Sequence, residues 1–126
     1  MLDHVSIAVS DIRRSICFYE KALAPLGITR LMSYGGTDEI PDHVGFGSDR
    51  KPYLWLGKGT PISGYVHIAL GAVDRASVDA FHSAALAAGG IDNGAPGPRP
   101  HYHAGYYGAF VLDPDGCNLE AVHHGF

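Results

Sequence analysis

Three side chains of the kinds that bind metal ions, His4, His67 and Glu120, each belong to a segment with the apolar pattern of a strand. Two imidazoles and one carboxylate form a recognised ligand set that leaves positions open for water or substrate. This donor set suits Fe(II), Mn(II), Ni(II) or Zn(II) and does not choose among them. The sequence therefore predicts one divalent cation, if the fold brings the three side chains together.

A second group of reactive side chains lies in the stretch from Arg99 to Tyr107, which carries a guanidinium, imidazoles and phenols. We expect His103 to serve as a general acid or base near neutral pH. Arg99 is predicted to hold a carboxylate, and Tyr107 to donate a hydrogen bond to a bound oxygen. The alternative is an exposed loop whose aromatic side chains only cover the core.

An internal repeat relates the two histidines of the predicted site. Shifting the sequence by 63 positions places His4 on His67, Asp11 on Asp74 and Phe18 on Phe81, and Gly27-Ile28 falls on Gly90-Ile91. In each half a strand is followed by an aspartate, an amphipathic helix and a glycine. A repeat of this kind constrains the whole fold.

The elements expected from periodicity follow this repeat. Helices are predicted from Asp11 to Gly27 and from Asp74 to Ala88, with aspartate as a candidate N-cap. Strands are expected at 2–9, 29–34, 44–47 and 53–56, and again at 65–70, 106–112 and 118–122. Asn93 to Pro100 is predicted to be a Gly/Pro-rich loop, and Asp113 to Gly116 a tight hairpin turn.

Side chains on a strand alternate between its two faces, so the repeat also predicts which positions share the site. Aligning Tyr53-Leu54-Trp55-Leu56 with Asn118-Leu119-Glu120-Ala121 makes Trp55 the counterpart of Glu120. The indole N–H is only a donor, so Trp55 cannot bind the cation. We expect it to line the substrate pocket, or else to pack in the core.

These patterns predict an α+β fold in which two βαβββ modules form a curved, mostly antiparallel sheet around a concave site, with the helices outside. The 126 residues form one domain, with module 1 at about 1–57, a linker at 58–64 and module 2 at about 65–126. Neither half buries enough surface to be stable alone, which favours pairing of the two.

Composition narrows the possible partners and location. The net charge is −4 and basic residues are scattered, so nucleic acid is not expected as a partner. No stretch has the roughly 20 apolar residues that a membrane helix needs, and no secretory signal is recognised. Two cysteines do not make a disulfide framework, so a cytoplasmic location is expected.

The chain resembles the vicinal oxygen chelate superfamily, which includes glyoxalase I, extradiol dioxygenases, and fosfomycin and bleomycin resistance proteins. The resemblance rests on the segments 4–11 and 67–70, on Phe18-Tyr19, and on the closing segment 113–120, which is the most specific. It implies that His4, His67 and Glu120 bind the metal. It also implies a small substrate that chelates the metal through adjacent oxygens, while the metal acts as a Lewis acid.

Individual relatives differ from this chain at particular positions. Glyoxalase I uses a fourth ligand where this chain has Trp55, so glyoxalase I itself is disfavoured. Extradiol dioxygenases carry a histidine where His103 stands and a tyrosine where Phe110 stands, so one of two catalytic helpers is present and Phe110 lines the site. Fosfomycin-modifying enzymes carry a threonine where Ser6 stands, which places Ser6 beside the substrate.

The leading interpretation is thus a metal-dependent lyase or dioxygenase acting on a small oxygen-rich molecule. The first alternative is a metal-free binding or antibiotic-resistance protein, and the second is a regulatory domain with a decayed site. Relatives commonly form homodimers, and some build each site from two subunits. The repeat does not distinguish a closed monomer from such a shared site.

Overall fold

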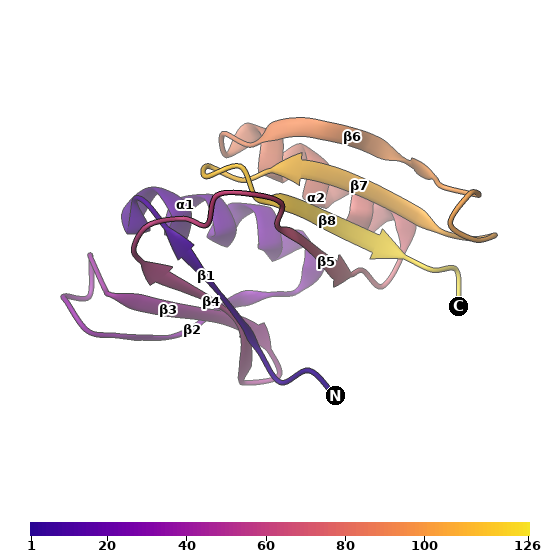
Figure 1. The fold of residues 1–126 in the computed structure, drawn as a ribbon. Coiled ribbons are helices and arrows are strands. Elements are labelled where there is room, and N and C mark those ends of the chain that lie inside the picture. Colours follow the sequence, from indigo (N-terminus) through magenta and orange to yellow (C-terminus); the bar gives the residue numbers. More distant parts are fainter.

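The two halves of the chain form two βαβββ modules, as predicted from the repeat (Figure 1). The structure is a computed structural model that describes all 126 residues. Module 1 consists of β1 (Val5–Val9), α1 (Ile12–Leu23), a short 3-10 helix η1 (Ala24–Leu26), β2 (Thr29–Tyr34), β3 (His43–Ser48) and β4 (Lys51–Lys58). Module 2 consists of β5 (His67–Gly71), α2 (Arg75–Ala87), β6 (Ile91–Pro98), β7 (Tyr107–Leu112) and β8 (Asn118–His123).

Each module has its own four-stranded sheet. The strand orders are β1-β4-β3-β2 and β5-β8-β7-β6. The pairs β1–β4 and β5–β8 are parallel and the other four are antiparallel, so the sheets are mostly antiparallel, as expected. One continuous curved sheet does not form within the chain, because β1 and β5 are edge strands that pair with no strand of the other module.

Capping residues set the ends of both helices. Asp11 and Asp74 have extended backbones and accept hydrogen bonds from the backbone N–H groups of Arg14 and Ser77. These bonds satisfy N–H groups that a helix leaves free at its start. After η1 the chain leaves through Gly27, whose φ of 75° suits glycine.

One hydrophobic core joins the two modules. Each helix buries an apolar stripe against one face of its sheet, and the helices also contact each other. At their meeting point Gly90 lies so close to Phe18 that a Cβ would come within 2.9 Å of the phenyl ring. Neither helix is long and apolar enough to span a membrane.

The face of each sheet opposite its helix is left open. Along β1, Ser6 and Ala8 are exposed while Val9 is fully buried, and along β5, His67 and Ala69 are exposed. These open faces hold several of the side chains that the sequence assigned to the site, Ser6 and His67 among them. The two modules therefore bury their helix-facing residues together and present two separate sheet faces outward.

One element prediction was wrong. The segment predicted as a loop, Asn93 to Pro100, lies mostly in strand β6. Its glycines and prolines are tolerated because β6 is an edge strand with register shifts between Asp92 and Gly97. An edge strand needs partners on one side only, so a missing N–H costs little.

Candidate metal centre

His67 and Glu120 lie together on the open face of module 2. The parallel pairing of β5 with β8 sets Ala69 beside Glu120, and His67 stands two residues before Ala69 on the same face. The His67 Nε2 atom is 2.7 Å from Glu120 Oε1. Glu120 is only 1% exposed, whereas the His67 side chain is 33% exposed. Two side chains of the kinds that bind metal ions therefore meet here, and the His67 side chain is partly exposed to solvent.

Tyr106 holds the other oxygen of this carboxylate. Its hydroxyl donates a hydrogen bond to Glu120 Oε2, and burial, followed by this hydrogen bond, raises the pKa of Tyr106. Gly108 leaves space for the same oxygen, since a Cβ there would be 3.1 Å from Oε2. Glu120 is thereby fixed on one side and turned toward His67 on the other.

His4 stands apart from this pair. It precedes β1 on the other module, its side chain is 53% exposed, and its Nδ1 is 2.7 Å from Asp3 Oδ1. Asp3 also accepts a hydrogen bond from Lys51, and these contacts lower the pKa of Asp3, Lys51 first and His4 second. No three side chains of histidine, cysteine, aspartate or glutamate form a metal-binding group within the chain. One chain thus assembles two of the three predicted ligands, and the complete triad stays a prediction.

Strand register confirms that Trp55 is the counterpart of Glu120. Ser6 pairs with Trp55 in module 1 as Ala69 pairs with Glu120 in module 2. His4, Ser6 and Trp55 all line a cavity of about 540 Å³ on the open face of module 1. Trp55 therefore lines a pocket rather than filling the core.

Phe110 and Arg99 lie on the face that carries Glu120. The Phe110 ring centroid is 6.0 Å from that of His67, and the Arg99 guanidinium lies 5.5 Å from the Phe110 centroid. That guanidinium donates to the carbonyl oxygens of Ala95 at 2.8 Å and Gly97 at 2.9 Å. Arg99 thus braces the end of β6, and holding a substrate carboxylate would require it to leave these carbonyls.

His103 and Tyr107 occupy different sides of the second sheet. The His103 ring packs 5.3 Å from that of Tyr106, and its Nε2 is 2.9 Å from Nδ1 of His124. Tyr107 lies on the helix side, where its hydroxyl donates to Asp79 at 2.7 Å, the main cause of its raised pKa. The phenol next to His67 and Glu120 is therefore Tyr106, which sequence reasoning missed.

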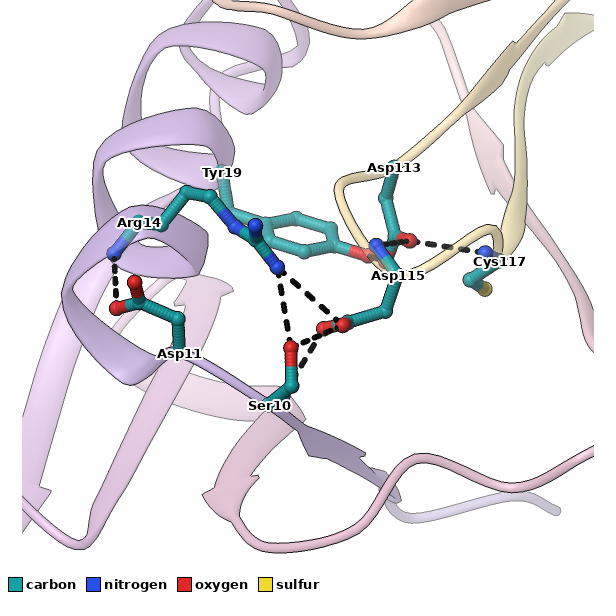
Figure 2. Close-up of polar contacts among 7 residues, drawn as sticks. All are labelled: Ser10, Asp11, Arg14, Tyr19, Asp113, Asp115 and Cys117. Carbon is teal, nitrogen blue, oxygen red and sulfur yellow. Dashed lines mark hydrogen bonds and ion pairs between the residues drawn. The ribbon is translucent and has the colours of Figure 1, made fainter.

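The hairpin after β7 joins the modules through two aspartates that sequence reasoning treated only as turn residues (Figure 2). Asp113 is 4% exposed and accepts a 2.5 Å hydrogen bond from the Tyr19 hydroxyl of α1, as well as bonds from two backbone N–H groups. Asp115 accepts from the backbone N–H and hydroxyl of Ser10. These contacts fix the start of β8, the strand that carries Glu120.

Comparison with known proteins shows the family to which the chain belongs. The family model described as Glyoxalase/Bleomycin resistance protein/Dioxygenase superfamily matches residues 1–121. No curated protein matches the chain in sequence.

Solved structures of several organisms share the fold. A glyoxalase/bleomycin resistance protein from Albidiferax ferrireducens T118 is 26% identical, with a TM-score of 0.76 and 95% of both chains covered. Glyoxalase I from Zea mays is 29% identical with a TM-score of 0.69, and the alignment covers 97% of this chain but 45% of that longer one. TioX from Micromonospora sp. ML1, at 16% identity and a TM-score of 0.70, shows likeness of fold alone. The chain belongs to the Glyoxalase/Bleomycin resistance protein/Dioxygenase superfamily.

Proposed function

We propose that this chain is a metal-dependent enzyme of the vicinal oxygen chelate type, a lyase or dioxygenase acting on a small oxygen-rich substrate. One divalent cation (Fe, Mn, Ni or Zn) would be held by His4, His67 and Glu120. The observation that carries the proposal is the contact between His67 and the buried carboxylate of Glu120. Membership of the superfamily supports it.

The donor set fits a cation for an electrostatic reason. A buried ionised carboxylate is costly unless a positive charge or several donors balance it. No lysine or arginine lies within ion-pair distance of Glu120, whose polar contacts are His67 and Tyr106. A divalent cation bound between Glu120 Oε1 and the partly exposed His67 side chain would balance an ionised carboxylate there.

We propose that the third ligand comes from a second copy of the chain. His4 and the His67–Glu120 pair lie on open sheet faces of different modules, and β1 and β5 are both edge strands with one side free. A homodimer that sets module 1 of one copy beside module 2 of the other would complete the site. Such a two-fold arrangement gives two equivalent sites.

The roles of the surrounding residues follow from their contacts. When bound, the cation supplies Lewis-acid stabilisation of negative charge on substrate oxygens. Tyr106 orients Glu120, Phe110 and Trp55 form apolar walls, and Ser6 offers a hydroxyl beside Trp55. His103, next to the Tyr106 ring, is the proposed general acid or base.

Metal binding by the purified protein tests the ligand set. After EDTA treatment and dialysis, Mn(II) or Co(II) is expected to bind at one ion per chain. The variants His4→Ala, His67→Ala and Glu120→Gln should each lower the affinity by at least tenfold. Unchanged affinity in Glu120→Gln would contradict the proposed site.

Mixing two variants, each lacking one proposed metal ligand, tests whether the site is shared between two copies. In a dimer of His4→Ala and Glu120→Ala copies, one site would lose both ligands and the other would regain all three. After unfolding and refolding an equal mixture, about a quarter of the sites should bind metal as the parent does. A site within one chain would restore none, and refolded single variants serve as controls.

A second candidate function is small-molecule binding without a metal, as in antibiotic resistance. The aromatic cavity beside Trp55, which contains only one of the three metal ligands, favours this candidate. Tight ligand binding after EDTA treatment, with no turnover of the ligand when any of the metals is added, would support it. For either function we propose a cytoplasmic location, in keeping with the two free cysteines.

A further inference from the structure

The open face of module 1 carries a wall of aromatic rings that includes Trp55 and extends beyond it. Tyr34, His43 and Trp55 come from three neighbouring strands, β2, β3 and β4, and all line the 540 Å³ cavity. Tyr34 is 57% exposed, although exposing the apolar surface of a large ring to water is unfavourable. Exposed rings gathered at one cavity indicate a binding surface.

The rings form a continuous row. The Tyr34 and His43 rings are stacked, with centroids 4.6 Å apart and planes 24° apart. The Tyr34 and Trp55 centroids are 5.7 Å apart. Gly45 allows the indole to lie close over β3, because a Cβ at Gly45 would be 2.9 Å from two indole carbons. The indole is therefore held in place by the backbone beneath it.

Small side chains leave room beside this wall. Ser6 and Ala8 on β1, with Gly57 on β4, also line the cavity. At its rim the Lys51 ammonium is 2.8 Å from Asp3, so the two charges largely cancel. Nothing in the cavity selects strongly for a charged ligand, and its volume lies in the usual range of about 300 to 1,000 Å³ for small-molecule sites.

We propose that Tyr34, His43 and Trp55 bind a flat, uncharged aromatic ring of the ligand. Aromatic rings prefer stacked or edge-to-face contact, and both arrangements are open to a ring lying against this wall. The inference deepens the proposed function and rests on it only for the ligand's oxygens, which His4 at the same cavity places near the cation. The ring contact itself needs no metal.

Trp55 makes the contact measurable, because it is the only tryptophan in the chain. The probes are catechol and cis-1,2-cyclohexanediol, which share adjacent hydroxyls on a six-membered ring but differ in flatness. Each is titrated into EDTA-treated protein while Trp55 fluorescence is followed. Catechol should change the emission saturably and bind at least about fivefold tighter than the diol, the gain expected from ring stacking.

A pair of matched variants locates the contact. Tyr34→Leu should weaken catechol binding about fivefold, whereas Tyr102→Leu, which removes a tyrosine of nearly equal exposure (55%) on module 2, should change it by less than twofold. Circular dichroism checks that both variants fold. Equal affinity for the two probes, or equal loss in both variants, would overturn the inference. The catechol titration contains no metal, so its result does not depend on the metal-affinity test with Glu120→Gln. The further inference and the proposed metal site can therefore fail independently.

Discussion

Replacing Tyr19 with phenylalanine should cost the protein about 2 kcal/mol of unfolding free energy. The change removes only the hydroxyl, which donates a 2.5 Å hydrogen bond to Asp113 between two buried side chains (Figure 2). Hydrogen bonds to charged groups contribute about 1.5 to 3 kcal/mol. Asp113 Oδ2 then loses its donor, whereas Oδ1 keeps the backbone donors of Asp115 and Cys117, so a loss within this range is expected.

Urea denaturation at neutral pH measures this loss, and thermal unfolding should show a Tm about 8 °C lower for a chain of this length. Tyr107→Phe is the matched control. It removes the same atom from the same kind of bond, 2.7 Å long to Asp79, but on an exposed surface. Water replaces such a bond easily, so the control should lose less than about 0.5 kcal/mol.

Two results would refute this reasoning. If the unfolding free energy of Tyr19→Phe stays within about 0.5 kcal/mol of the parent's, the buried hydrogen bond between the modules does not stabilise the fold. If Tyr107→Phe loses as much as Tyr19→Phe, burial is not what makes the bond strong. A parallel loss of metal affinity in Tyr19→Phe alone would link the hairpin to the placement of Glu120.

Three further outcomes are expected. Tyr106→Phe should lower Co(II) affinity about tenfold without unfolding the protein, because it frees Glu120 Oε2; titration monitored by the Co(II) absorption spectrum checks this. Gly108→Ala should also weaken metal binding in that assay, because its Cβ would crowd the same oxygen. Burial and the nearby Asp113 raise the pKa of Tyr19, so folded protein keeps a proton that unfolded chains lose; unfolding free energy should fall above about pH 10, and less steeply in Tyr19→Phe.

Local pattern predicted the parts of the fold that depend on neighbours in sequence. The helix caps at Asp11 and Asp74 and the equivalence of Trp55 with Glu120 are confirmed because capping and strand alternation act over a few residues. β6 was missed because its glycines and prolines oppose a strand locally. Tertiary pairing with β7 outweighs that preference.

The sequence contains a signal that favours Tyr106 over Tyr107 as the tyrosine at the site. Phe110 was expected at the site, and counting back by twos from Phe110 gives Gly108 and then Tyr106 on the same face. Tyr107 lies on the opposite face and contacts α2 through Asp79. A one-residue shift in a strand reverses the face of every side chain, so the register of β7 decides which phenol reaches Glu120.

The position of His4 depends on contacts that no local pattern encodes. The repeat predicts equivalent places for His4 and His67 in their modules, but not how the modules meet. Packing of α1 on α2 sets the two sheet faces apart within the chain, and β1 and β5, each at the edge of its own sheet, do not pair with each other. Whether the triad closes is therefore a question about association, which a sequence repeat does not determine.

The difference between the two modules limits how copies can combine. Module 1 offers His4 and Trp55, whereas module 2 offers His67 and a buried carboxylate, so only the second has a carboxylate at the proposed metal position. Two first modules facing each other would have no carboxylate at the metal position. Two second modules would bring together two buried Glu120 side chains, whose like charges repel. Pairing of unlike modules is the combination that yields two histidines and one carboxylate, with the aromatic wall of module 1 opposite Glu120.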